Sequence, residues 1–240
     1  MTILCIETST SVCSAAICKD GVPAEQCICR EGSNHARLLP RYIQYLLQYA
    51  QDHSLTIDAV ALSEGPGSYT GLRFGTATAK GLCYGMNIPL IPIPTLEILC
   101  EAAKKQSAVS FQPSDLLCPM IDARRMEVYT TVTGYGVQVT GAKAVIVENE
   151  ESLMEGEPVT GYGLRDVYYF GDGAAKCQSV LTQPNWHFIP DIVPEAQFMG
   201  TLAEQLTANG QGLKANEIAY YEPYYLKEFI AAQSHVKGLL

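Results

Sequence analysis

The sequence predicts an α/β protein made of two lobes with similar architecture. Two observations predict this fold class. Strand-like and helix-like segments alternate through the first half of the chain, and three consecutive strand-like segments open each half. The length of 240 residues suits one large domain or two small ones. We therefore expect one lobe in residues 1–108 and a second lobe in residues 109–240.

The strand-like segments of the first lobe are short, apolar and bounded by turn residues. They are residues 3–6, 12–18, 22–30, 59–62 and 88–93. The helix-like segments repeat apolar residues every three or four positions and begin beside Ser, Asn or Thr, which can cap a helix. They are residues 35–51, 68–85 and 95–106.

The second lobe repeats this order with less regular segments. Its expected strands are residues 116–121, 126–133, 137–147, 167–170 and 186–189. Its expected helices are residues 174–181 and 195–208. The aromatic segment from Tyr220 to Leu226 is expected to pack back on a domain, with the first lobe as the candidate.

Charge and cysteine content narrow the possible functions. The formal net charge is −9, from 16 Lys and Arg against 25 Asp and Glu, so we do not expect the chain to bind RNA or DNA alone. Charged residues make up 17% of the chain against about 25% in a typical protein, which indicates that another protein covers part of the surface. Nine cysteines without a Cys-x-x-Cys motif, and no visible secretory leader, predict buried thiols in a cytoplasmic protein. The absence of an 18-residue apolar run predicts no membrane span.

The first two helices carry more apolar and small residues than one lobe needs. On a helical wheel, the apolar residues of 35–51 fill an arc of roughly 200°, whereas packing on a sheet needs about 100°. In residues 68–85, Gly71, Gly75 and Ala79 form one row of small residues, and Ala77, Gly81 and Gly85 form a second row. Each mid-helix glycine costs about 1 kcal/mol relative to alanine, which is reasonable where another backbone must come close.

These helices are therefore interpreted as a docking surface for another protein, and burial within their own lobe is the alternative. The predicted docking residues are Leu38, Leu39, Tyr42, Ile43, Leu46, Thr70, Gly71, Phe74, Gly75, Thr78 and Ala79.

Two polar turns could hold a nucleotide, although both could also be ordinary turns. Glu7, Thr8 and Ser9 follow the first strand and could place a carboxylate beside hydroxyls for magnesium and phosphates. Gly171, Asp172 and Gly173 follow a strand of the second lobe and could admit a purine against bare backbone.

The sequence lacks the usual catalytic motifs. Gly65-Pro66-Gly67-Ser68 stands where a phosphate loop would, but no lysine follows it as a Walker motif requires. His35 is followed by Leu38 and Leu39 where a helical metal pair would place its second ligand, so no metal site is expected. We predict no catalytic residue and no cofactor.

Five segments occur in an order that resembles a known family. The most specific is Gly65-Pro66-Gly67-Ser68-Tyr69-Thr70-Gly71-Leu72-Arg73, and the others are Ile3 to Thr10, Ser33 to Pro40, Ile121 to Arg125 and Pro223 to Lys227. Together they span nearly the whole chain, which resembles the TsaB (YeaZ) family of tRNA threonylcarbamoyladenosine biosynthesis proteins.

The resemblance implies a two-lobed actin-like ATPase fold (ASKHA, ribonuclease H-like) and a non-catalytic paralogue of the catalytic subunit TsaD. TsaD-like proteins carry a His-x-x-x-His metal motif, whereas this chain keeps His35 and has Leu39 at the second position. The resemblance also implies binding to a TsaD-like subunit through the first-lobe helices and binding to a TsaE-like ATPase. The implied reaction of the complex is threonylcarbamoyl transfer to the adenosine beside the anticodon of tRNAs reading ANN codons.

We expect tRNA to be bound only through that complex, and the isolated chain to form a homodimer. The alternative function is an autonomous enzyme, either an actin-fold ATPase or kinase that uses Glu7 and Asp172, or a metallopeptidase that uses His35.

Overall fold

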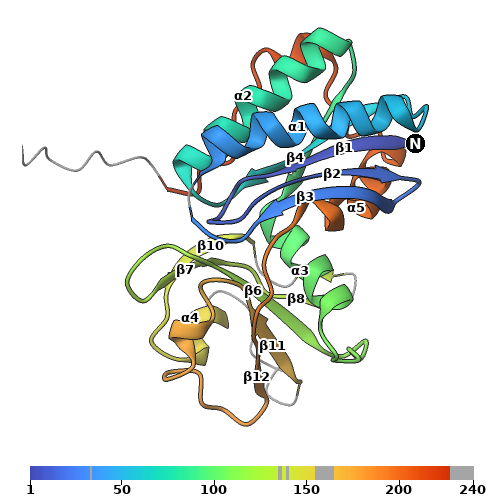
Figure 1. Ribbon diagram of the computed structural model, residues 1–240. Helices are drawn as coiled ribbons and strands as arrows, with labels where there is room; N and C mark the ends of the chain where they lie inside the picture. Colours follow the sequence, from blue (N-terminus) through green and yellow to red (C-terminus); the bar gives the residue numbers. More distant parts are fainter. Residues whose placement is uncertain (33, 135–136, 139–140, 155–164, 228–240) are drawn as a thin grey trace, which may run out of the picture.

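The computed structural model describes residues 1–32, 34–134, 137–138, 141–154 and 165–227 (Figure 1). Two mixed sheets, each covered by helices, confirm the predicted α/β fold class. Their strand orders correspond: β3-β2-β1-β4-β5 in the first sheet and β10-β7-β6-β11-β12 in the second. In each, two antiparallel strands lead to a central strand, which pairs with one parallel strand that pairs in turn with a second, as in the actin-like fold.

The elements of the first lobe begin and end within a few residues of their predicted bounds. Its strands are β1 (Thr2–Glu7), β2 (Cys13–Lys19), β3 (Val22–Cys29), β4 (Ala59–Gly65) and β5 (Leu90–Pro94). Its helices are α1 (His35–Asp52), α2 (Tyr69–Met86) and α3 (Thr95–Gln106).

Apart from its edge strand β3, the first sheet is buried on both faces, because different helices cover each one. Alternate side chains of a strand point to opposite faces, so Leu4 and Ile6 pack towards α1 and α2. Ile3 and Cys5 face the other way and belong to a core shared with α3 and with α5 (Met199–Ala208). Figure 1 shows α1 and α2 together on one side of this sheet, with α3 and α5 on the other.

The second lobe follows the predicted order with interruptions. Its described elements are β6 (Leu116–Asp122), β7 (Glu127–Thr130), β8 (Thr133–Gly134), β9 (Val137–Gln138), β10 (Lys143–Ile146), α4 (Glu150–Met154), β11 (Val167–Phe170) and β12 (Trp186–Ile189). The strand expected over 126–133 is split into β7 and β8. Both halves pair with β6, and the break lies beside Pro119, which has no N–H to donate to the ladder.

Two predicted helices of the second lobe need correction. Residues 174–181 form only the 3₁₀ turn η1 (Ala175–Cys177), because Gly173 is packed against the backbone of β6. Most of the backbone hydrogen bonds of this segment run to the third residue before the donor, and only that of Leu181 runs to the fourth, Cys177. The helix expected over 195–208 is α5 preceded by the 3₁₀ turn η2 (Ala196–Phe198). A short helix, α6 (Ala215–Ile218), was not predicted.

The chain returns to the first lobe after β12. Helix α5 packs on the first sheet, where a Cβ at Gly200 would lie 2.8 Å from the Cβ of Cys18. The aromatic tail then lies along α2: Lys80 Nζ donates to the carbonyl oxygens of Ala219 (2.7 Å) and Tyr221 (3.1 Å). These contacts place residues 199–224 against the first sheet and α2. The division of the chain into two lobes after residue 108 remains a prediction.

A helix that crosses a bilayer is both long and predominantly apolar. Within the residue ranges that the structure describes, no helix combines these two properties.

Candidate functional site

A buried carboxylate stands where the first central strand ends. Glu7 is the last residue of β1 and has no exposed surface. Its Oε1 accepts hydrogen bonds from the backbone N–H and the hydroxyl of Ser9, both at 2.6 Å. Its Oε2 is buried without a hydrogen-bond partner among the described residues. Burial raises the pKa of Glu7 to about 7, hydrogen bonds from Ser9 oppose that rise, and the nearby charge of Asp172 adds to it.

The second lobe brings Asp172 towards Glu7. Asp172 Oδ1 accepts a hydrogen bond from the backbone N–H of Asp122 at 2.9 Å, and desolvation raises the pKa of its carboxyl. Gly171 has φ +108°, and a Cβ there would lie 2.2 Å from the carbonyl oxygen of Met120. This glycine is therefore required by the close packing of β11 on β6, independently of any ligand.

The predicted nucleotide site is thus assembled only in part. The structure brings Glu7 and Asp172 close enough to interact electrostatically, whereas the Thr8 hydroxyl donates to the carbonyl oxygen of Gly71 at 2.9 Å. Gly173, like Gly171, packs against the backbone of β6. Nucleotide binding by these residues remains a prediction. No cluster of three or more metal-ligating side chains occurs in the part of the chain that the structure describes.

Several predicted docking residues are instead part of the core of the first lobe. On α1, Leu39, Ile43 and Leu46 are 1%, 6% and 0% exposed and pack on the first sheet. Their assignment to a docking surface is wrong, because their side chains are buried inside their own lobe, as the alternative interpretation predicted. Leu38 and Tyr42 are half-buried beside them.

The first row of small residues on α2 is likewise explained by internal packing. A Cβ at Gly71 would lie 2.0 Å from the carbonyl oxygen of Thr8, and one at Gly75 would lie 2.4 Å from the Thr8 hydroxyl. Ala79 has no exposed surface. These three residues let α2 approach the turn after β1, so their assignment to a docking surface is also wrong.

The second row lies open on the other side of α2. A Cβ at Gly81 or Gly85 would meet no described atom within 4 Å. Phe74 is 41% exposed and Tyr84 is 89% exposed. Exposed residues recur with a spacing of three and four along this helix, and we call them the α2 stripe: Thr70, Phe74, Ala77, Gly81 and Tyr84.

The α2 stripe is thus the surface on which the docking prediction depends. Of the predicted docking residues, Thr70 and Phe74 belong to it, and Thr78 is half-buried at its edge. The predicted docking residues left out Ala77 and Gly81, although sequence analysis placed both in the second row of small residues. Tyr84 was missed altogether, although its spacing from Gly81 carries the signal.

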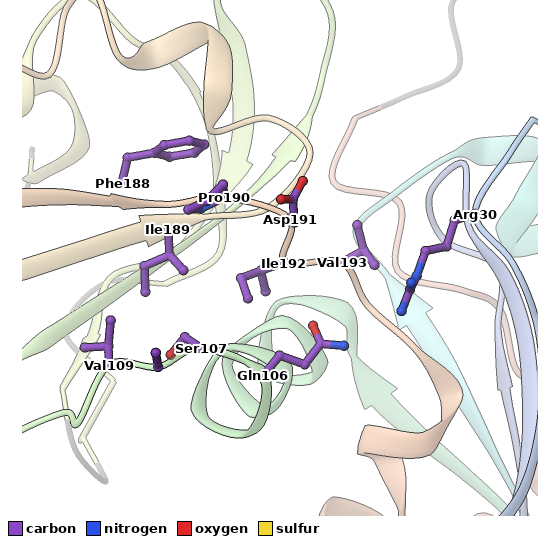
Figure 2. Close-up of a pocket in the computed structure, with 11 residues that line it drawn as sticks. Arg30, Gln106, Ser107, Val109, Phe188, Ile189, Pro190, Asp191, Ile192 and Val193 are labelled. Carbon is purple, nitrogen blue, oxygen red and sulfur yellow. The ribbon is translucent and has the colours of Figure 1, made fainter.

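A pocket of about 680 Å³ lies at the seam of the two lobes (Figure 2). Its wall is mostly apolar and comes from the two chain segments that cross between the lobes. The labelled lining residues in Figure 2 are Arg30, Gln106, Ser107, Val109, Phe188, Ile189, Pro190, Asp191, Ile192 and Val193.

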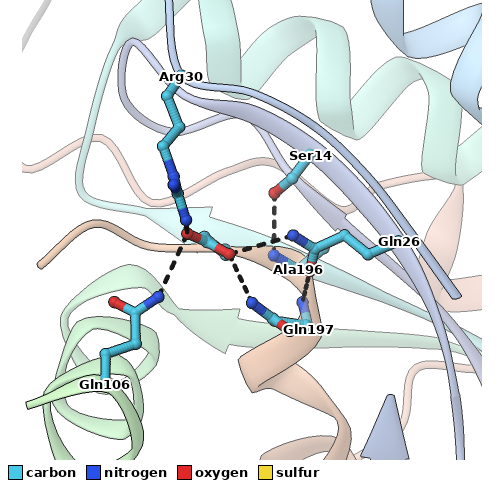
Figure 3. A network of polar contacts seen from close by, with 7 residues as sticks. Ser14, Gln26, Arg30, Gln106, Ala196 and Gln197 are labelled. Carbon is cyan, nitrogen blue, oxygen red and sulfur yellow. Dashed lines mark hydrogen bonds and ion pairs between the residues drawn. The ribbon is translucent and has the colours of Figure 1, made fainter. Parts of the chain in front are cut away.

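A polar network beside this pocket joins the crossing segments to the first sheet (Figure 3). Glu195 has no exposed surface, and its carboxylate is paired with the Arg30 guanidinium. It also accepts hydrogen bonds from Gln26 (3.1 Å) and Gln197 (2.7 Å). Burial alone would raise the pKa of Glu195, but these partners hold it below its ordinary value. Sequence analysis missed this network, because only the fold brings β3 beside residue 195.

The comparison with protein families matches one model. Residues 30–180 match the TsaD family, described as tRNA N6-adenosine threonylcarbamoyltransferase. The matched region runs from the end of β3 to η1 and therefore includes α1, α2 and most of the second sheet.

Full-length relatives and solved structures point to the same group. The chain is 28% identical to an Escherichia coli protein named tRNA threonylcarbamoyladenosine biosynthesis protein TsaB, with 96% of each chain covered. It is 26% identical to a Bacillus subtilis protein of the same name, over 95% of this chain and 94% of that one. The structure of YeaZ from Pseudomonas aeruginosa is similar with a TM-score of 0.70 and 25% identity, covering 94% of this chain and 99% of that one.

Proposed function

We propose that this chain, which belongs to the TsaD family and within it to the TsaB (YeaZ) group, is an accessory subunit in tRNA threonylcarbamoyladenosine biosynthesis. In this proposal it binds a TsaD-like catalytic subunit and supports threonylcarbamoyl transfer to the adenosine beside the anticodon of tRNAs reading ANN codons. A TsaE-like ATPase joins the complex, and tRNA is bound only through it. The complex works in the cytoplasm.

The observation that carries this proposal is the exposure of the α2 stripe. Gly81 costs about 1 kcal/mol of helix stability relative to alanine, and none of the described residues lies close enough to require its small size. Tyr84 exposes an aromatic ring, the kind of side chain that anchors protein interfaces. A stripe of small residues that ends in an aromatic anchor suits close packing against a partner helix. When the partner is absent, the same stripe is available to a second copy, which supports the expected homodimer.

The chain's own residues support an accessory role over catalysis. His35 is 6% exposed and its Nε2 is hydrogen-bonded to the carbonyl oxygen of Val12 at 3.1 Å. One turn later, Leu39 packs in the core, so α1 supplies no second metal ligand there. We therefore assign no catalytic residue to this chain.

A second candidate function has one specific observation in its favour. The buried Oε2 of Glu7 lacks a partner among the described residues and lies in the field of Asp172. Two carboxyl groups from opposite lobes could hold the magnesium of a bound nucleotide, as an autonomous ATPase or kinase would require.

Titration of the TsaD-like subunit encoded in the same genome distinguishes these functions. We expect the chain to form a complex and to raise threonylcarbamoyl transfer to tRNA. Tyr84→Ser should weaken complex formation by a factor of about 30, the effect of losing an aromatic anchor. Ile146→Ser is the matched control, because Ile146 is 62% exposed on the second lobe and should have no effect. Unchanged binding by Tyr84→Ser, or ATP hydrolysis by the isolated chain, would contradict the accessory role.

A further inference from the structure

Two cysteines face each other at the edge of the first sheet. Strand β3 is its outer strand and is paired with β2 (Figure 1). Cys29, the last residue of β3, lies directly opposite Cys13, the first residue of β2. Residues opposite each other in antiparallel strands point to the same side of the sheet, and Cys13 packs on the side that α1 covers. The two side chains are therefore neighbours beneath α1.

The register of the strands favours a disulfide between these two cysteines. Directly opposed residues of an antiparallel pair have Cα atoms about 4.5–5.5 Å apart, within the roughly 4.4–6.8 Å that a disulfide spans. Diagonal neighbours are about 7–8 Å apart, which a disulfide bridges only if the backbone moves. Cys13 and Cys27 are a diagonal pair, and so are Cys5 and Cys18. The Cys13–Cys29 pair is thus the one in this sheet whose backbone is already spaced for the bond.

The two partners differ in access to solvent, which sets the order of reaction. All nine thiols of the chain are free, and Cys27 and Cys29 are half-buried while the other seven are buried. Cys29 Sγ lies 3.2 Å from the carbonyl oxygen of Glu31, in the exposed turn after β3. Burial raises the pKa of Cys13 to about 12, so this residue stays a thiol. Cys29 is therefore the cysteine that an oxidant reaches first.

A second pair of thiols in the same sheet provides an internal comparison. The sulfur atoms of Cys5 and Cys18 lie 3.8 Å apart, but neither residue has exposed surface. Their backbone positions are also diagonal. Closeness of the two sulfur atoms alone would favour this pair, whereas backbone spacing and access favour Cys13 with Cys29.

We propose that Cys13 and Cys29 form a reversible disulfide when a low-molecular-weight disulfide oxidises the chain. The Cys29 sulfur attacks one sulfur of the reagent and breaks its S–S bond. A mixed disulfide remains on Cys29, and one reagent thiol leaves with the Cys29 proton. The Cys13 sulfur then attacks the Cys29 sulfur, and the second reagent thiol leaves with the Cys13 proton. The two cysteines lose two electrons in total, and the reagent is reduced to two thiols.

The bond would fasten β3 to β2 at the point where the chain leaves the sheet. Arg30 follows Cys29 directly, and its guanidinium is paired with the buried Glu195. Disulfides that form in reducing compartments are transient, and partly exposed ones are the labile, regulatory kind. This modification does not depend on the proposed accessory role.

Incubation of the full chain with excess oxidised glutathione at pH 7.5 tests this proposal. Free thiols are then alkylated in denaturant and counted by mass spectrometry, and an intramolecular disulfide appears as two thiols lost without an added glutathione. The wild type should lose two of its nine thiols in this way, and dithiothreitol should restore both. Cys13→Ala should instead accumulate the mixed disulfide at Cys29, and Cys29→Ser should form no intramolecular disulfide.

Two further variants show which pair forms the bond. Cys27→Ser is the matched control, because Cys27 lies on the same strand, faces the same side and is also half-buried. This variant and Cys18→Ala should both form the disulfide as the wild type does. No intramolecular disulfide in the wild type would overturn the proposal. So would its persistence in Cys29→Ser, or its loss in Cys27→Ser or Cys18→Ala. Because Cys27 and Cys29 are half-buried, both serine variants are expected to fold.

Discussion

The two rows of small residues on α2 should respond to substitution in opposite ways. Gly81→Ala adds a Cβ to open space and should stabilise the chain by about 1 kcal/mol through helix propensity. Gly71→Ala gains the same propensity, but its Cβ would lie 2.0 Å from the carbonyl oxygen of Thr8. That oxygen belongs to the backbone and cannot rotate away. Overpacking of this kind costs about 1–3 kcal/mol or more, so the net effect should be destabilising.

Urea unfolding of the two variants and the wild type measures both effects. Each should be measured at two protein concentrations, because a homodimer through the α2 stripe would make stability depend on concentration. A less stable Gly81→Ala variant, or equal effects of the two substitutions, would refute the assignment of the rows. Gly81→Leu extends the test to function: its fold should persist while affinity for the TsaD-like subunit falls at least tenfold. An unchanged affinity would show that no partner approaches α2 closely at this position.

Two buried carboxylates should give opposite pH dependences of stability. The pKa of Glu7 is raised from 4.5 to about 7, so between these pH values the folded chain holds a proton that the unfolded chain has lost. The free energy of unfolding of the wild type, measured relative to that of Glu7→Gln, should therefore fall by about 3 kcal/mol as the pH rises from 4.5 to 7. If the difference in free energy of unfolding between the wild type and Glu7→Gln, measured with urea, did not change from pH 4.5 to 8, the raised pKa of Glu7 would be contradicted. The pKa of Glu195 is lowered instead, so its contribution should be present near neutral pH and be lost as pH falls below the ordinary range of a carboxyl. At pH 7, Glu195→Gln should destabilise the chain by about 2–4 kcal/mol, because the amide places a donor among the donors of Arg30, Gln26 and Gln197. Glu151→Gln is the control, because Glu151 is exposed. An equal loss of stability in the two variants would count against a stabilising role of the Glu195 network.

The order of elements in the first lobe could be predicted because local signals agree with the fold. Strands β1, β2, β4 and β5 of the first sheet each have a run of residues that suits burial. Turn residues such as Asp20 and Gly21, both with positive φ, separate β2 from β3. The second lobe was less predictable. Pro119 interrupts pairing along β6, and Gly173 is held by tertiary contacts, so segments with strand or helix patterns are cut short there.

The sequence could predict which residues are candidates for a site, but not which of them the fold brings together. Glu7 and Asp172 lie 165 positions apart, and only the arrangement of the lobes brings their charges into interaction. The Glu195 network was missed for the same reason, because its partners come from β3, from the end of α3 and from η2.

The sequence by itself determined the two-lobed α/β architecture, the family, and the presence of two helices with an unusual number of apolar and small residues. Hydrophobic periodicity and glycine spacing are local properties, so they can be read along the chain. Only the tertiary structure decided which side of each helix is buried, because that depends on what packs against it. The turn after β1 covers Gly71 and Gly75, whereas Gly81 and Tyr84 remain open to a partner.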